Sequence, residues 1–148
     1  MIEIRVQPGD FDPAIELARL EALGGGAVAS FVGQVRGDGG LTELFLDHYP
    51  AMTDRMLRAL ADEAAGRWPL IGVVLIHRIG ALGAGERIVL VATASAHRAA
   101  ALESCAFLID RLKTDAPFWK RERFGDRSHW VDAREADDVA ADRWRRPD

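Results

Sequence analysis

The chain has 148 residues, of which 49% are apolar and 28% are charged; this fits one domain with a hydrophobic core and argues against disorder. Its formal net charge of −4 argues against a general binder of nucleic acid or anionic membranes, and no segment approaches the roughly 20 apolar residues of a membrane span. No signal peptide is predicted and the single cysteine, Cys105, excludes an internal disulfide, so the composition predicts a soluble cytoplasmic domain.

The first half of the chain alternates between strand and helix patterns. Apolar periodicity and turn residues predict a strand, a helix, two further strands and a second helix, over residues 2–6, 12–22, 27–36, 41–49 and 52–66. Asp12 followed by Pro13 marks the start of the first helix. The short glycine-rich connection between the second and third strands predicts that they form an antiparallel hairpin.

The second half predicts a strand pair, a long helix and two short strands, over residues 70–79, 87–94, 96–114, 118–124 and 128–131. The long helix is expected to bury one apolar stripe, which comprises Leu102, Cys105, Leu108, Ile109 and Leu112. Strands joined mainly by tight turns, with three helices between them, predict a largely antiparallel α+β fold. We expect one domain over residues 1–133 and a charged tail over residues 134–148.

Lysine is rare in this chain, since all but two of the 19 basic residues are arginine. The exceptions are Lys113 and Lys120. An amine can give up its proton when desolvated and can attack a carbonyl, whereas a guanidinium stays charged, so two amines retained in one segment indicate a chemical role. Two ordinary surface lysines explain the spacing equally well. The amines meet only if the chain turns back between them, because seven extended residues span roughly 24 Å.

Two further segments place polar side chains where a scaffold presents them. His97 and Arg98 lie where a strand runs into a helix, and the first turn of a helix suits an anion such as phosphate or carboxylate. The alternative is that Ser95 only caps the helix while both other side chains face solvent. Gln34 and Arg36 share one face at the end of a strand, which favours a common pocket unless Arg36 simply ends the strand in water.

The cysteine and most histidines form no catalytic motif. Cys105 lies on the apolar stripe of the long helix, which favours a core position over a nucleophile. His48, His77 and His129 are dispersed and show no metal-ligand spacing. His77 shares strand parity with apolar neighbours, which predicts a packed or interface residue.

Four segments, read in order, carry a recognisable pattern: FVGQVRG at residues 31–37, LDHYPAM at 46–52, HRIGALGAGE at 77–86 and VATASAHRAAALESCAFLIDRLKTDAPFWKRE at 91–122. Together they closely resemble the large, catalytic subunit of molybdopterin synthase (the MoaE family). The similarity covers roughly residues 1–131, nearly the whole chain, and residues 95–122 are its most specific part. The resemblance implies a single domain with a hammerhead-like α/β arrangement.

The resemblance also implies a reaction and its partners. A small ubiquitin-like subunit brings a C-terminal glycine thiocarboxylate, and its tail enters a pocket on the large subunit. Two sulfurs from successive partner molecules are placed on cyclic pyranopterin monophosphate, which gives the dithiolene of molybdopterin. Because the sulfur arrives on the partner, the large subunit needs no catalytic cysteine, metal or cofactor. The family implies a homodimer of large subunits within a heterotetramer.

By the same resemblance, the substrate pocket uses Gln34, Val35, Arg36, His97, Arg98, Lys113, Lys120, Arg121 and Glu122. The arginines and the imidazole suit the cyclic phosphate. Lys113 is the expected catalytic amine beside the partner's acyl group, either polarising that group or acting as general acid or base. Lys120 is the second expected catalytic residue, which stabilises an anionic sulfur or pterin intermediate.

Two other functions fit parts of the same pattern. One is a non-catalytic module that binds the tail of a ubiquitin-like protein without chemistry. The other is a lysine-dependent lyase or hydrolase that acts alone on a phosphorylated heterocycle. A requirement for the thiocarboxylated partner separates the synthase from both.

Overall fold

The computed structural model describes residues 1–116, 118–131 and 135–145. Its elements, in chain order, are β1 (Ile2–Gln7), α1 (Pro13–Glu21), β2 (Ala27–Gln34), the 3-10 turn η1 (Asp38–Gly40), β3 (Glu43–His48), α2 (Pro50–Arg67), β4 (Leu70–Arg78), β5 (Gly80–Leu82), β6 (Arg87–Ser95), α3 (Arg98–Asp115), β7 (Phe118–Phe124), β8 (Arg127–Trp130) and α4 (Glu135–Asp142). Among the described residues, no helix is long and apolar enough to cross a membrane.

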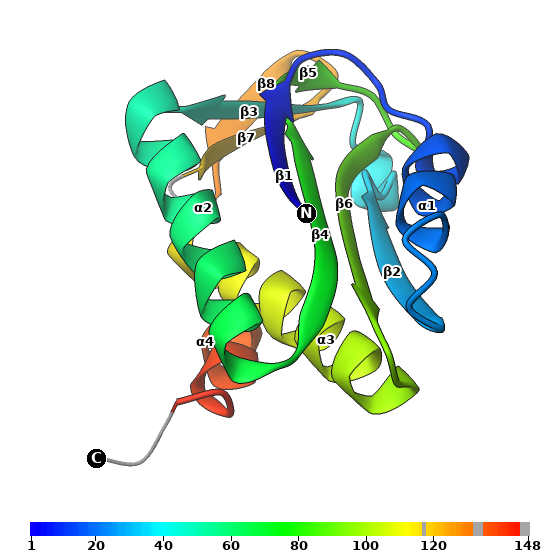
Figure 1. Cartoon of the computed structure of the whole chain (residues 1–148). Coiled ribbons are helices and arrows are strands. Elements are labelled where there is room, and N and C mark those ends of the chain that lie inside the picture. The colour runs from blue at the N-terminus through cyan, green and yellow to red at the C-terminus, as the bar shows by residue number, and fades with distance from the viewer. Residues whose placement is uncertain (117, 132–134, 146–148) are drawn as a thin grey trace.

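The strands form two four-stranded sheets, with the orders β1–β4–β6–β2 and β5–β3–β7–β8. The pair β1–β4 is parallel and the other described pairs are antiparallel, so the predicted α+β class is confirmed. In Figure 1, α1 covers one face of the first sheet, α2 and α3 lie on the opposite side, and the second sheet runs across one end of the first.

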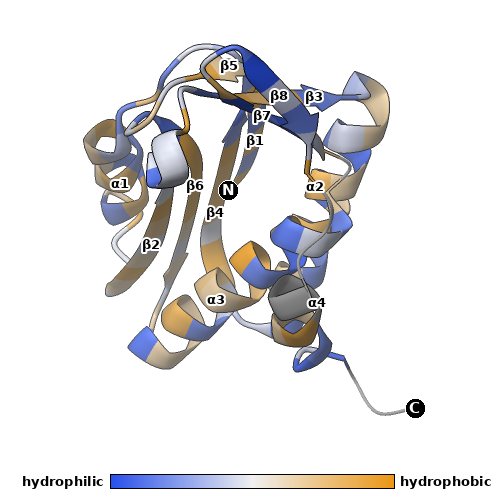
Figure 2. Ribbon diagram, turned by 180° about the vertical axis from the view of Figure 1, so that it is seen from behind, coloured by the Kyte–Doolittle hydropathy of each residue, from blue (hydrophilic) through white to orange (hydrophobic). Residues whose placement is uncertain are grey.

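Strand β4 is buried on both faces, which explains its unbroken apolar sequence. Side chains alternate along an extended strand. Val73 and Leu75 pack in the cluster formed with α2 and α3, whereas Val74 and Ile76 pack with Leu20 of α1. Figure 2 shows the resulting contrast between the hydrophobic β4 and the hydrophilic β8. The burial of β4 fixes the register of the strand, and therefore the side to which each of its last side chains points.

The predicted hairpin between residues 27–36 and 41–49 is wrong. The strands exist, but β2 pairs with β6 in the first sheet, whereas β3 pairs with β5 and β7 in the second. The connection between them contains η1 and carries the chain from one sheet to the other. The pairing follows burial, since β6 is the strand whose inner face completes the core beside β2.

The buried stripe of α3 differs from the prediction at several positions: Ile109 is only half-buried, whereas Ala101 and Ser104 are buried. Leu102 is 61% exposed, whereas Phe107 is fully buried. The Phe107 ring packs against Trp68 at 5.3 Å between centroids, and the guanidinium of Arg67 lies 4.6 Å from its centre. A chain of contacts through one aromatic ring therefore joins α3 to α2.

A fourth helix, α4, lies in the segment expected to be a charged tail. Trp144, just after it, packs edge-on against both Phe107 and Trp68, each at 5.7 Å. Its indole N–H donates to the Asp110 carboxylate at 2.7 Å, and Arg67 donates to its carbonyl oxygen. Over its described residues this segment is thus attached to the core; the predicted boundary at residues 133–134 lies outside the described residues.

We expect Phe107→Ala to lower the free energy of unfolding by about 3–5 kcal/mol, because it removes a buried ring that three segments share. Arg58→Ala, at an exposed position of α2, is the control, with an expected change within about 0.5 kcal/mol. Urea unfolding followed by tryptophan fluorescence measures both. Equal effects of the two substitutions would contradict the assigned packing of α3.

Candidate active site

Lys113 and Lys120 line the same cavity, which has a volume of about 40 Å³. The remaining lining residues are Leu44, Leu46, His77, Ile88, Val89, Leu112, Ala116 and Phe118. We call this the lysine cavity. Lys113 lies in the last turn of α3 and Lys120 is the third residue of β7. The Phe118 N–H donates to the Ala116 carbonyl at 2.9 Å, which turns the chain back so that the two amines converge.

The walls of the lysine cavity are mostly aliphatic. Leu44 and Leu46 come from β3 and are nearly fully buried. Lys120 pairs with Leu46 and Glu122 with Leu44 in the β3–β7 ladder, so strand alternation puts Lys120 and Glu122 on one face of β7. Lys113 is exposed and Lys120 half-buried, so Lys113 is the more accessible of the two lysines. Charges act more strongly against such a wall than in water.

His77 is the third polar side chain that lines the lysine cavity. It is 5% exposed, its ring stacks on Phe118 at 3.8 Å between centroids, and its Nδ1 lies 2.7 Å from the Arg78 carbonyl oxygen. Burial, together with the positive charges of Lys120 and Lys113, lowers the pKa of His77 from 6.5 to about 3. The imidazole is therefore neutral at physiological pH, and Nδ1 carries its proton because a carbonyl oxygen only accepts.

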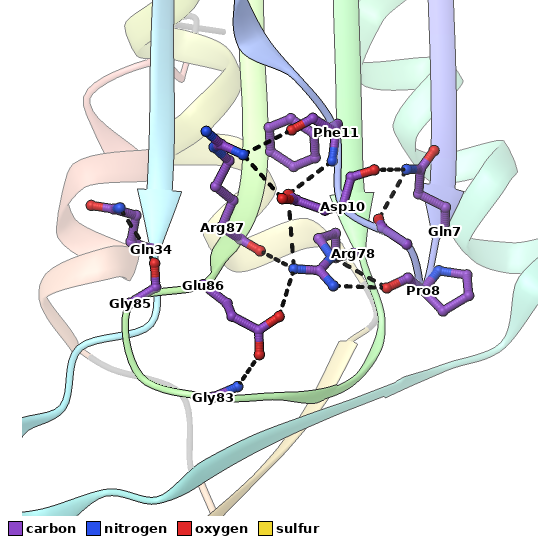
Figure 3. Close-up of polar contacts among 11 residues, drawn as sticks. Gln7, Pro8, Asp10, Phe11, Gln34, Arg78, Gly83, Gly85, Glu86 and Arg87 are labelled. Atoms are coloured by element: carbon purple, nitrogen blue, oxygen red, sulfur yellow. Dashed lines mark hydrogen bonds and ion pairs between the residues drawn. The ribbon is translucent and has the colours of Figure 1, made fainter.

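On the opposite face of β4, Arg78 holds the loop between β5 and β6 (Figure 3). Its guanidinium donates to the carbonyl oxygens of Pro8 and Arg87 and lies 3.3 Å from the Glu86 carboxylate. The Glu86 carboxylate also accepts from the Gly83 N–H. This hydrogen bond and the nearby Arg78 lower the pKa of Glu86. The loop is thus fixed at both of its ends.

The same loop holds the segment Gln34–Arg36. The Val35 N–H donates to the Glu86 carbonyl at 2.9 Å, and the Gly85 N–H donates to the Val35 carbonyl at 2.8 Å. Gly85 does so at φ +85°, a conformation that favours glycine. Val35 is buried in the cluster that contains Leu44 and Leu46, two walls of the lysine cavity. Arg36 follows it into solvent, and its Nε lies 3.7 Å from the Asp38 carboxylate.

His97 and Arg98 lie at the other end of α3. His97 is the N-cap residue, and neither its side chain nor that of Ser95 caps the helix, since Ser95 is buried and donates to the Pro69 carbonyl. Both His97 and Arg98 are exposed. Fifteen helical residues separate Arg98 from Lys113, which places their Cα atoms about 22 Å apart. Within one chain, this pair does not reach the lysine cavity.

Arg121 lies on the face of β7 opposite to Lys120. It pairs with Phe45 in the ladder, and its guanidinium lies 5.0 Å from the centre of the Phe45 ring and 5.6 Å from that of Trp130. These cation–π contacts hold Arg121 away from the lysine cavity. Of the predicted Lys120–Glu122 segment, the first and last residues therefore share the cavity side.

Cys105 occupies the core, as predicted from the stripe of α3. Its Sγ lies 3.7 Å from the Val91 carbonyl oxygen, and burial raises the pKa of its thiol to about 11. A thiol that stays protonated is a poor nucleophile.

A larger cleft of about 390 Å³ lies between α2, α3 and α4. Its lining arginines are paired with neighbouring carboxylates: Arg67 and Arg111 both contact Glu63, at 2.8 and 2.9 Å, and Arg145 contacts Asp142 at 3.0 Å. These pairs largely neutralise the cleft. The smaller lysine cavity is the better candidate for chemistry, because its walls are apolar and both of its charges have the same sign.

A family model described as MoaE protein matches residues 6–115. The chain belongs to the MoaE family. It is 51% identical over 146 residues to the molybdopterin synthase catalytic subunit of Pseudomonas aeruginosa, covering 95% of this chain and 97% of that relative. The MoaE protein of Burkholderia ambifaria superposes with a TM-score of 0.85 at 48% identity, covering 97% and 98% of the two chains. Molybdopterin synthase of Staphylococcus aureus gives 0.78 at 30% identity, covering 88% and 96%.

Membership of the MoaE family confirms the resemblance read from the four sequence segments. The sequence singled out both lysines and the Gln34–Arg36 segment but predicted His77 to be a packed or interface residue. A histidine amid the apolar β4 pattern was the available signal, since a buried imidazole requires a specific hydrogen-bond partner. Only the fold reveals that this strand ends beside the two amines.

The burial of His77 predicts a pH dependence of stability. Below pH 6.5 the unfolded chain binds a proton at this imidazole, whereas the folded chain does so only near pH 3, so the free energy of unfolding falls as pH falls through this window. Between pH 7 and 5 this contribution amounts to about 2 kcal/mol, since one pKa unit corresponds to about 1.4 kcal/mol.

His77→Gln, which has no titratable group, removes this contribution. The stability difference between the parent chain and His77→Gln is expected to shift by about 2 kcal/mol in favour of the variant from pH 7 to 5. Denaturant unfolding of both proteins across this range measures it. Parallel pH curves would show that the folded imidazole titrates as in water.

Proposed function

We propose that this chain is the catalytic subunit of molybdopterin synthase. It transfers sulfur from the C-terminal thiocarboxylate of a small ubiquitin-like subunit to cyclic pyranopterin monophosphate and so forms the dithiolene of molybdopterin. Membership of the MoaE family over most of the chain supports this function. The observation that carries it is the convergence of Lys113 and Lys120 on one apolar-walled cavity. A cytoplasmic location stays the prediction made from the composition.

Both lysines suit an acyl-sulfur group that enters the cavity from solvent. Lys113 is the more exposed of the two lysines that line the cavity, so the tail of the partner meets this amine first. Its ammonium polarises the acyl oxygen or acts as general acid or base. Lys120 lies deeper against Leu46 and stabilises the anionic sulfur or the pterin intermediate. Aliphatic walls strengthen both interactions, because they keep water away from the charges.

Arg36 binds the phosphate of the pterin at the edge of the cavity, supported by Gln34 and Val35. The loop held by Arg78 keeps this segment in place through backbone hydrogen bonds, which favours a defined position of the guanidinium. An arginine fork matches a phosphate in two contacts. Glu122 shares the cavity side of β7, whereas Arg121 keeps its predicted role only if the substrate or the partner reaches the opposite face.

His97 and Arg98 contribute from a second copy of the chain. The length of α3 keeps them about 22 Å from Lys113 of the same chain, so one substrate contacts both only when two chains meet. The surface around this pair suits such a contact: Leu102, one turn further along α3, is 61% exposed, and β2 is an edge strand on which Phe31 is 38% exposed. We therefore propose a homodimer with composite sites, within a heterotetramer that contains two small subunits.

Substitutions at Lys113 test the catalytic proposal. Lys113→Ala is expected to lower sulfur transfer at least about 100-fold, the usual contribution of a general acid or base, while the partner still binds. Lys113→Arg keeps the charge but not the labile proton and is expected to be similarly inactive. Arg58→Ala, an exposed position on α2, is the control and retains the parent activity.

The assay combines the chain with thiocarboxylated partner and cyclic pyranopterin monophosphate, and mass spectrometry detects the sulfur added to the pterin. Full activity of Lys113→Arg would reduce the role of Lys113 to its charge. Product formed without partner would favour a lone lyase or hydrolase, and partner binding without turnover by the parent chain would favour a binding module.

Mixed dimers test the composite site. Lys113→Ala and the double variant His97→Ala/Arg98→Ala are each expected to be inactive alone. After subunit exchange in an equimolar mixture, activity is expected to return to about a quarter of the parent value, because half of the dimers are mixed and each then holds one intact site. A mixture that stays inactive, although exchange is verified by mass spectrometry, would contradict a site shared between chains.

A further inference from the structure

We propose that His77 is a positioning residue of the lysine cavity: its imidazole is a hydrogen-bond acceptor that orients one ammonium group of the pair Lys113 and Lys120 toward the incoming acyl-sulfur. The identity of the incoming group, an acyl-sulfur, rests on the proposed function. That His77, Lys113 and Lys120 line one cavity is an observation of the structure.

Only one nitrogen of the His77 ring is able to accept. Nδ1 lies 2.7 Å from the Arg78 carbonyl oxygen. Because this oxygen can only accept, Nδ1 carries the proton and donates it in this hydrogen bond. Nε2 is therefore unprotonated and carries a lone pair. Because the Arg78 backbone belongs to the same strand end, this choice of tautomer is built into β4 and does not depend on bound substrate.

The ring plane of His77 is also fixed. Phe118 stacks on it with an interplanar angle of 14°, and His48 lies on Phe118 in turn, at 6.1 Å between centroids. His48 is itself held by a 3.2 Å contact between its Nδ1 and the Thr53 hydroxyl. Stacking in this order restricts rotation of the imidazole, so its acceptor nitrogen has a defined direction.

Among the residues that line the lysine cavity, His77 is the one whose side chain can accept a hydrogen bond. Apart from the two lysines, the other lining residues have aliphatic or aromatic hydrocarbon side chains. The charged or titratable groups that act on the imidazole are Lys113 from α3, Lys120 from β7 and His48 from β3. Burial of the ring and the positive charges of Lys120 and Lys113 keep it neutral, so it remains an acceptor throughout the physiological pH range.

A neutral acceptor suits this site better than a carboxylate. A carboxylate beside the two amines would cancel their charge and repel an anionic thiocarboxylate. An imidazole lone pair directs an N–H group without removing its positive charge. His77 thus fixes the direction of an ammonium and leaves its field available to the substrate.

Two variants of similar size separate the acceptor from the packing role. His77→Gln places an amide oxygen near the position of Nε2, whereas His77→Asn places its amide N–H near Nδ1 and leaves no acceptor that reaches the cavity. We expect His77→Asn to lower kcat about ten- to a hundredfold, the value of a hydrogen bond to a charged group, with KM for the pterin unchanged. His77→Gln is expected to recover most of kcat, although both variants unfold at similar temperatures.

A second readout needs no turnover. Because the chain contains only two lysines, labelling with 13C-lysine gives two side-chain signals that NMR follows during a pH titration. Loss of an acceptor destabilises the ammonium form, so at least one lysine is expected to titrate at lower pH in His77→Asn than in the parent chain and in His77→Gln. Long-range 1H–15N spectra of the parent are expected to show His77 protonated at Nδ1 alone.

The outcomes separate this inference from the proposed function. Identical lysine titrations in all three proteins, or a parent imidazole protonated at Nε2, would overturn the role of His77. If kcat falls in each variant in proportion to its loss of thermal stability, His77 has a packing role only. Shifted titrations in a parent chain that transfers no sulfur would leave the role of His77 intact and contradict the proposed function.

Discussion

The end of strand β4 is the constraint on which both halves of the proposed site depend. Alternation along an extended strand sends His77 to the lysine cavity and Arg78 to the loop beside Arg36. A shift of one position would move every side chain of β4 to the opposite face, where the packed neighbours fit a different side chain, so close packing on both faces holds the register. The hydrophobic core thereby sets the positions of polar groups that belong to two different parts of the site.

Electrostatics explains why so small a cavity is suited to acyl-sulfur chemistry. Lys113 and Lys120 bring two positive charges to a wall of Leu44 and Leu46, which screens them less than water on all sides would. Two like charges in such a place disfavour each other, and an anion that enters between them relieves the repulsion. His77 adds an acceptor without adding a negative charge. The positive charges of the two lysines are therefore not neutralised by His77 and remain available to attract the proposed anionic tail.

The length of α3 places the predicted pocket residues at two separate locations. One end of the helix carries His97 and Arg98, and the other carries Lys113, so a single rigid element separates groups that the family resemblance assigns to one pocket. The described contacts of Phe107 hold this helix firmly on α2, which excludes bending as a way to bring the ends together. The proposed association of two chains would bring both groups to one site without any change of the fold.

The sequence by itself determined the class of fold, most strand and helix positions, the core location of Cys105 and, through its motifs, the family. These properties depend on local periodicity and on residue identity. Which strands pair, and which side chains share a cavity, only the tertiary structure decided: β2 and β3 join different sheets, Leu102 faces outward, and His77 meets Lys113 and Lys120. The physical reason is that burial is a property of the whole packed chain, so contacts between distant segments follow from the competition for its interior and not from any local pattern.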